Sequence, residues 1–142
     1  FNEDDYAKAM ADTYGGKIPQ ETLQMYIDAV EKGDYELASK YFIGDNQEKE
    51  LKSFEGITKE RINDITQLLN SLRIVDFRTQ LSDMYDEDVK RFNEMSESKE
   101  EYINRLYKAW NYDNKALMKS DKNNYSVNFK KYPNGIWKII EI

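Results

Sequence analysis

The side chains that could do chemistry in this sequence are carboxylates, tyrosines, lysines and serines. The chain has 142 residues and contains neither cysteine nor histidine. Thiolate nucleophiles, imidazole bases, Ser-His-Asp triads and ordinary zinc sites are therefore excluded together. A glycine-rich phosphate loop is also excluded, because the six glycines are isolated apart from Gly15 and Gly16. We expect no cofactor and no metal.

Asp76 is the candidate for a general base. Residues 75–81 alternate between apolar and polar types, which predicts a half-buried strand that places Asp76 between Val75 and Phe77. Burial beside apolar groups would raise the pKa of this carboxyl group, as general-base catalysis requires. The alternative is an outward-facing charge on a half-exposed strand. We favour this alternative, because a single carboxylate without an identified partner is weak support for catalysis.

The densest acidic cluster comprises Asp83, Asp86, Glu87 and Asp88. Hard cations such as calcium prefer oxygen ligands of this kind. The spacing does not match an EF-hand loop, and the glycine of that loop is missing. We favour a solvated first turn of a helix that leads to Val89 and Phe92, where the helix dipole stabilises negative charge.

Aromatic side chains supply the predicted binding site. The sequence contains eleven Tyr, six Phe and two Trp residues, and aromatic walls with a few polar groups are typical of small-ligand pockets. Packing in the core is the alternative for each of them, because large apolar residues are mostly buried. The predicted ligand-binding pocket comprises Tyr41, Phe77, Trp110, Tyr112 and Trp137.

Helical spacing dominates the first third of the chain. A short helix is predicted over residues 3–14, and we expect residues 1–18 to be loosely packed. A helix–turn–helix pair follows over residues 21–42. Gly33 suits the left-handed turn between its two helices, and Asp34 suits the N-cap of the second one.

Four further helical segments are predicted in the middle of the chain. Residues 46–54 are mostly polar and predict a surface helix. Thr58 is the predicted N-cap of the next helix. Helical spacing returns over residues 84–95, and Ser98 with Glu101 predicts a capping box at the start of another helix.

The C-terminal residues predict a β-hairpin. Residues 125–130 alternate between apolar and polar types, and a type I turn is predicted with Pro133 in its second position and Gly135 in its fourth. The return strand, residues 136–142, is apolar on both faces. We expect it to lie inside a larger sheet, because an isolated two-stranded hairpin is marginally stable.

Two segments resemble the nuclear transport factor 2-like (cystatin-like) superfamily. They are IDAVEKGDYELASKYF at positions 27–42 and NGIWKI at positions 134–139, and bacterial extracytoplasmic and lipoprotein members are the most similar. The resemblance implies a single α+β domain over residues 1–142, in which N-terminal helices pack on a curved antiparallel sheet around a cone-shaped cavity. Residues 45–120 are unmatched and richer in helix than is usual. Enzymes of the superfamily commonly use His or Asp in the cavity, and this chain has no His.

Charge and hydropathy narrow the range of partners. The formal charge is −6, without a basic run, which argues against a nucleic-acid partner. No stretch approaches the roughly 20 apolar residues of a membrane span, so we expect no direct membrane insertion. The chain begins at Phe1 rather than Met, and we expect a processed fragment with a possible lipid or N-terminal anchor outside it.

We therefore expect a non-catalytic domain of an extracytoplasmic bacterial protein that binds a small molecule or a protein. One alternative is a carboxylate-based enzyme that uses the cone cavity. Another is a tetratricopeptide-like helical scaffold, which residues 33–38 resemble. That scaffold requires a repeat near every 34 residues, and no second copy is present. An enzyme needs an ionisable group in a closed apolar pocket, whereas a repeat scaffold would contain stacked helix pairs and little sheet.

Overall fold

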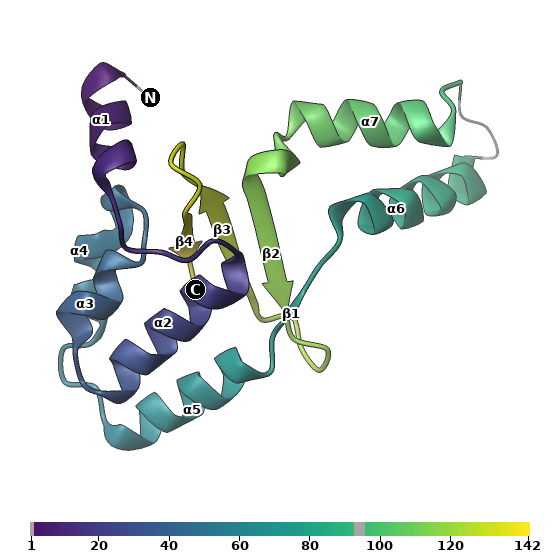
Figure 1. Ribbon diagram of the computed structural model, residues 1–142. Coiled ribbons are helices and arrows are strands. Elements are labelled where there is room, and N and C mark those ends of the chain that lie inside the picture. Colours follow the sequence, from purple (N-terminus) through teal and green to yellow (C-terminus); the bar gives the residue numbers. More distant parts are fainter. Residues whose placement is uncertain (1, 93–95) are drawn as a thin grey trace.

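The computed structural model describes residues 2–92 and 96–142, which form an α+β fold with one antiparallel sheet (Figure 1). The helices are α1 (Glu3–Ala11), α2 (Pro19–Glu31), α3 (Tyr35–Lys40), α4 (Gly44–Ser53), α5 (Lys59–Asn70), α6 (Phe77–Phe92), α7 (Lys99–Ala109) and the short 3-10 helix η1 (Tyr112–Asn114). The strands are β1 (Arg73–Ile74), β2 (Lys115–Lys119), β3 (Ser126–Lys131) and β4 (Trp137–Glu141). The predicted α+β class is confirmed.

The sheet has the strand order β1-β2-β3-β4, with every neighbouring pair antiparallel. The predicted C-terminal hairpin is confirmed as β3 and β4. Its turn is closed by a hydrogen bond from the Gly135 N–H to the Tyr132 carbonyl at 2.9 Å. Gly135 has φ of +90°, a conformation that a residue without Cβ adopts at little cost.

The hairpin belongs to a larger sheet, as expected, but β4 is an edge strand in this order and not an inner one. Its outer edge is nevertheless occupied by other parts of the chain. The Trp137 N–H donates to the Gly16 carbonyl at 2.9 Å, and the Ile139 N–H donates to the Tyr41 carbonyl at 2.9 Å. The Ile139 carbonyl accepts from the Ile43 N–H at 2.8 Å. These bonds pair backbone groups that an edge strand otherwise exposes.

The core lies between the sheet and the helix pair α2–α3. Helix α2 contacts β4, α3 and α5. The predicted helix–turn–helix is confirmed, because Gly33 has φ of +77° and the Asp34 side chain accepts from the Leu37 N–H at 3.1 Å. The most deeply buried apolar residues are Tyr26, Ile27, Ala29, Val30, Ala38, Phe42, Leu69, Val127, Phe129 and Ile139.

Most of the predicted helix starts are confirmed. Helix α4 has no buried residue, as expected for a surface helix. Thr58 accepts from the Arg61 N–H at 3.1 Å, and Ser98 with Glu101 forms the complete capping box of α7. The end of the helical prediction over residues 84–95 lies partly outside the described residues.

The predicted strand over residues 75–81 is wrong, because β1 contains only Arg73–Ile74 and α6 begins at Phe77. The carboxylate of Asp76 accepts from the Arg78 N–H at 3.0 Å and from the Thr79 hydroxyl at 2.9 Å. The first bond satisfies a backbone N–H that the first turn of a helix leaves unpaired, and the second holds the Asp76 side chain over that turn. Local capping therefore decides the structure here over the alternating pattern.

Helices α6 and α7 form an antiparallel hairpin that projects from the sheet (Figure 1). Leu81 is the buried residue of α6, and Tyr102 is that of α7. The acidic cluster lies in the middle of α6 and not in a first turn, which corrects our prediction. Within the described residues, no group of three acidic side chains could hold a metal ion, and no helix has the length and apolarity of a membrane span.

The N-terminal connector, residues 12–16, lies close against the backbone of β4. We therefore expect a methyl group added at Gly15 to destabilise the fold. A Cβ on Gly15 would collide with the carbonyl oxygen of Trp137. We expect Gly15→Ala to lower the free energy of unfolding by about 1–3 kcal/mol, because overpacking forces the backbone to shift. Urea unfolding monitored by circular dichroism measures the change.

Gly44→Ala is the matched control. A Cβ at Gly44 meets no atom within 4 Å, and this residue begins α4. We expect this substitution to raise the free energy of unfolding by about 0.4–1 kcal/mol, because it restricts the unfolded chain. Equal effects of the two substitutions would show that the connector does not approach β4 as described.

Candidate functional site

An open depression of about 370 Å³ lies where the start of α2, the β1–α6 connection, the α7–η1 segment, β2 and β4 meet. Four aromatic side chains contribute to its lining, namely Phe77, Tyr107, Tyr112 and Trp137. All four are half-buried. They therefore present apolar surface to solvent while being held by the fold. We call this site the aromatic depression.

Three of these rings support one another. The rings of Phe77 and Tyr112 are stacked, with centroids 3.9 Å apart and planes 8° apart. Tyr107 meets Tyr112 edge-on, with centroids 5.6 Å apart. Stacked and edge-to-face pairs stabilise a fixed ring arrangement beyond the burial of area alone, so this wall of the depression is preorganised.

Local structure places each ring. Phe77 is the first residue of α6, directly after the capping residue Asp76. Tyr112 opens η1 after Asn111, whose left-handed backbone, with φ of 53°, turns the chain from α7 towards β2. Trp137 opens β4, and its N–H bond to Gly16 fixes the start of that strand.

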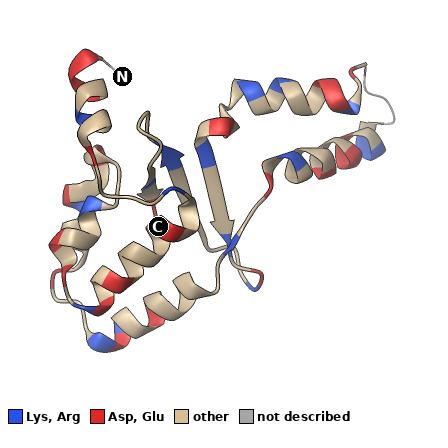
Figure 2. Cartoon of the chain, viewed as in Figure 1, with Lys and Arg blue, Asp and Glu red and all other residues tan. Residues whose placement is uncertain are grey.

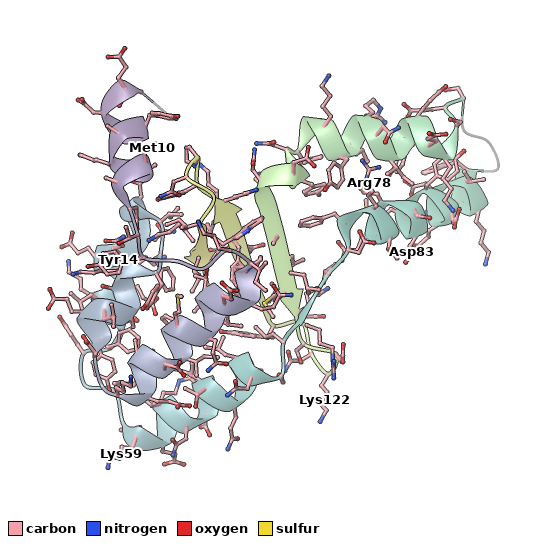
Figure 3. All side chains as sticks on the ribbon, in the orientation of Figure 1. Met10, Tyr14, Lys59, Arg78, Asp83 and Lys122 are labelled. Carbon is pink, nitrogen blue, oxygen red and sulfur yellow. The ribbon has the colours of Figure 1, made fainter. Side chains whose placement is uncertain are left out.

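Polar groups surround the aromatic wall. The Arg78 guanidinium lies 4.3 Å from the ring centroid of Tyr107 and donates to the Asn104 side chain at 3.0 Å, between α6 and α7 (Figure 3). Asp113 and Lys115 also line the depression. Burial raises the pKa of Tyr107, and the nearby Asp113 raises it further, so this hydroxyl is neutral near pH 7.

The structure brings together three of the five predicted pocket residues, namely Phe77, Tyr112 and Trp137. Trp110 is the C-cap of α7, is 58% exposed and does not line the depression. Tyr41 lies elsewhere, with its ring centroid 6.4 Å from that of Tyr14. The prediction did not include Tyr107, although its position one helical turn before Trp110 could have indicated it.

Asp76 does not have the properties expected of a general base. Its side chain is exposed rather than buried. The pKa of this carboxyl group is lowered, first by the hydrogen bond from the Thr79 hydroxyl and then by the bond from the Arg78 N–H. The favoured alternative, an outward-facing charge, is confirmed, although Asp76 precedes a helix and does not lie on a strand, and the general-base hypothesis is wrong.

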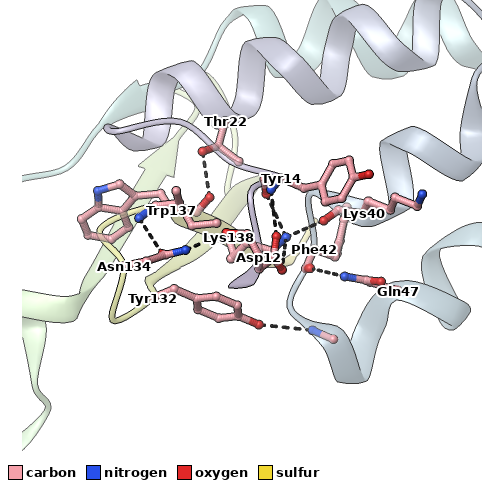
Figure 4. A network of polar contacts seen from close by, with 12 residues as sticks. Asp12, Tyr14, Thr22, Lys40, Phe42, Gln47, Tyr132, Asn134, Trp137 and Lys138 are labelled. Carbon is pink, nitrogen blue, oxygen red and sulfur yellow. Dashed lines mark hydrogen bonds and ion pairs between the residues drawn. The ribbon is translucent and has the colours of Figure 1, made fainter. Parts of the chain in front are cut away.

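A second polar cluster surrounds Lys138, which is completely buried (Figure 4). Its ammonium group donates to the Tyr14 carbonyl at 2.8 Å and to the Lys40 carbonyl, and it pairs with the Asp12 carboxylate at 2.9 Å. Burial lowers the pKa of Lys138, while Asp12 opposes the decrease. An ammonium group has three N–H donors, so these partners leave none for a ligand.

The same cluster joins the connector to β4 and α2 (Figure 4). The Thr22 hydroxyl donates to the Trp137 carbonyl at 2.9 Å and accepts from the Gly16 N–H at 2.9 Å. Asn134, in the hairpin turn, donates to the Asp12 carbonyl at 2.6 Å. These contacts are satisfied within the fold, and we assign this cluster a structural role.

Tyr26 and Glu50 form a third polar pair. The buried Tyr26 hydroxyl donates to Glu50 at 2.6 Å, and its ring lies 5.5 Å from that of Phe42 in the core. Burial raises the pKa of Tyr26 well above its usual range, and Glu50 adds to the increase. Burial also raises the pKa of Glu50, and the bond from Tyr26 opposes that increase. This pair connects the partly buried Glu50 of α4 to the buried Tyr26 of α2.

Comparison of the chain with protein-family models, with curated proteins and with solved structures finds no match. Its function must therefore be inferred from its own residues. The aromatic depression is open to solvent, whereas the buried Lys138 and Tyr26 make their hydrogen bonds within the fold. Among these three places, the depression is the one that a ligand can enter.

Removal of Asp12 should destabilise the fold strongly. Asp12→Ala leaves the buried Lys138 ammonium without its counter-charge, and breaking a buried pair in this way costs about 3–5 kcal/mol. We expect that loss in the free energy of unfolding, measured in urea. Asp12→Asn keeps an acceptor oxygen and should show a smaller loss.

Asp121→Ala is the control, because it removes an ion pair that is exposed to solvent rather than buried. Asp121 pairs with Arg73 at 3.1 Å, but the two side chains are 73% and 78% exposed. Solvent screening makes such pairs nearly neutral. If Asp12→Ala had as little effect as Asp121→Ala, the structural role assigned to Lys138 would be wrong.

Tyr26→Phe should change the acid titration of Glu50. The substitution removes the hydrogen bond that lowers the pKa of Glu50 and leaves the burial that raises it, so the pKa should rise further. A carboxyl group whose pKa is raised in the folded state makes its full contribution to the free energy of unfolding below the unfolded pKa of 4.5. That contribution is lost as the pH rises through the folded pKa. The variant should therefore lose more stability than the natural chain between pH 4.5 and neutrality.

Carboxyl-carbon NMR titration of Glu50 measures the pKa change, and urea unfolding at two pH values measures the stability change. At neutral pH we expect a loss of about 1.5–3 kcal/mol, typical of a hydrogen bond to a charged group. In the Tyr26→Phe, Glu50→Gln double variant, this extra pH dependence should disappear. A downward shift of the Glu50 pKa in Tyr26→Phe would contradict the assigned contact.

Proposed function

We propose that this chain is a non-catalytic binding domain whose ligand site is the aromatic depression. One observation carries the proposal: four half-buried aromatic side chains from α6, α7, η1 and β4 line a single open depression of about 370 Å³. Small-ligand sites have volumes of about 300–1,000 Å³ and combine aromatic walls with few polar groups. A folded domain exposes aromatic surface of this kind at an energetic cost that binding recovers.

Binding is favoured over catalysis by the titratable groups at the depression. A general base needs a pKa near the working pH, whereas hydrogen bonds to Thr79 and Arg78 lower the pKa of Asp76. The raised pKa of Glu50 belongs to a group that pairs with Tyr26 in the core. Neither of these two carboxyl groups therefore combines a raised pKa with a place in the depression.

The ligand we propose presents an apolar or aromatic group to the wall and polar groups to the rim. Asp113 and Lys115 supply both signs of charge at the rim. Acidic and basic side chains are both distributed over the helices (Figure 2), which supports a small molecule or a protein as the partner rather than a nucleic acid.

We also propose membership of the nuclear transport factor 2-like superfamily and a location outside the bacterial cytoplasm. The support is the resemblance of the two sequence segments, together with the packing of α2 against β4. Curvature of the sheet around a cone-shaped cavity is part of this proposal. The four-stranded sheet argues against the helical-repeat alternative, for which we expected little sheet.

Fragment binding tests the site, and the two tryptophans provide internal reporters. We would titrate the chain with indole and with cyclohexanol and follow the two indole N–H resonances by NMR. We expect shifts at Trp137, which lines the depression, and not at Trp110, which lies outside it. Tyr112→Ala should weaken binding about tenfold, because it removes one ring of the stacked pair.

Trp110→Phe is the matched control and also assigns the two resonances. Its side chain is exposed, so we expect this variant to bind both fragments as the natural chain does. Shifts of equal size at both indoles, or no shift at Trp137, would overturn the proposed site.

A further inference from the structure

The two edges of the sheet differ in what covers them. At β4, the outer edge is occupied by the chain itself, through Gly16 and the bridge between Phe42 and Ile139. At the other end of the strand order, β1 pairs with β2 alone among the described strands. The outer side of β1 is therefore the open edge of the sheet.

The backbone of Ile74 faces this open edge. The Val75 N–H donates to the Leu117 carbonyl of β2 at 2.8 Å, and Ile74 stands opposite Met118 in the register. In an antiparallel pair, residues that bond to the partner alternate with residues whose N–H and C=O point away from it. Since Val75 bonds inward, the N–H and C=O of Ile74 point outward. Its side chain is 47% exposed.

The open edge borders the aromatic depression directly. Ile74, Val75, Asp76 and Phe77 are consecutive and all line the depression. A chain paired with Ile74 would therefore run beside the aromatic wall. Side chains of an extended segment alternate between the two faces of the sheet, so alternate residues of such a chain would face the depression.

The opposite edge shows the kind of segment that pairs with this sheet. Ile139 of β4 donates to the Tyr41 carbonyl and accepts from the Ile43 N–H, in a parallel bridge centred on Phe42. The segment 41–43 thus pairs its backbone along the edge, while the Phe42 side chain is buried in the core. An extended peptide at β1 would repeat this combination of backbone pairing and one buried apolar side chain.

We propose that the β1 edge binds an extended peptide segment of a partner protein as an added strand, with an apolar side chain of that peptide in the aromatic depression. This inference rests on the proposed function and names the class of ligand. An extended peptide supplies both the backbone partners that Ile74 lacks within its sheet and the apolar group that the aromatic wall accommodates. Two copies of this chain would share only the short β1 and would leave the depression unfilled, so we favour a partner peptide.

Peptide selection on the full chain tests the proposal. A displayed library of short random peptides would be selected for binding to the Trp110→Phe variant of this chain, in which β1 and the aromatic depression are unchanged. One enriched peptide would then be synthesised. Ile74→Pro is the diagnostic variant, because proline removes the outward N–H and is tolerated at the exposed side of an edge strand. We expect it to weaken binding about tenfold, as the loss of one hydrogen bond to the peptide predicts. Ile74→Val is the matched control and should bind as well as the unsubstituted edge.

N-methylation of the peptide provides a second measurement that does not depend on the folding of Ile74→Pro. Replacing each peptide N–H in turn by N-methyl should abolish binding at one position, because Ile74 is the one residue of the two-residue strand β1 whose carbonyl faces an added strand. Equal sensitivity at every position, or at none, would overturn strand addition.

The outcomes separate this inference from the proposed function. Peptide binding that Tyr112→Ala weakens and Ile74→Pro leaves unchanged would keep the depression as the site and overturn strand pairing. Self-association of the chain that Ile74→Pro abolishes, without peptide binding, would assign the edge to a second copy and overturn the inference. Failure to enrich any peptide would also overturn it, and only a simultaneous absence of fragment shifts at Trp137 would overturn both.

Discussion

The buried ammonium group of Lys138 is the constraint on which the rest of the fold depends. A buried charge is costly unless its hydrogen bonds and its counter-charge are supplied, and here they come from Asp12, Tyr14 and Lys40. These partners belong to the N-terminal connector and the end of α3, whereas Lys138 lies in the last strand. The cluster therefore joins both ends of the chain and closes the outer edge of β4. With that edge closed, β1 carries the open edge of the sheet.

Local signals in the sequence predicted the helix boundaries and the final hairpin. Gly33 with Asp34, Thr58, and Ser98 each act on neighbouring backbone groups, so their effect can be predicted without knowledge of the tertiary structure. The turn ending at Gly135 is local in the same sense. The α+β class followed from these elements, because helices in the first half and a terminal hairpin leave few other arrangements.

Interactions between distant residues could not be predicted in this way. Lys138 donates to the backbone carbonyls of Tyr14 and Lys40, which lie 124 and 98 residues before it in the sequence. No side-chain pattern in the sequence indicates these acceptors. Phe77 and Leu81 in the segment 75–81 are also four residues apart, which places them on one helix face, and the capping bonds of Asp76 select the helix. Phe77, Tyr112 and Trp137 were predicted to share a pocket from residue type alone. Trp110 is exposed because it is the C-cap residue of α7, and the composition of the sequence does not reveal that position.

The aromatic depression lies at the base of the α6–α7 hairpin, and this position links binding to the placement of the hairpin. The two helices bury only Leu81 and Tyr102 fully among their described residues, so little core holds them against the sheet. The stack of Phe77 on Tyr112 joins the start of α6 to the segment after α7. Trp137 belongs to β4 and lines the same depression. A ligand there contacts both the hairpin base and the sheet, so its binding free energy would be coupled to the orientation of α6 and α7.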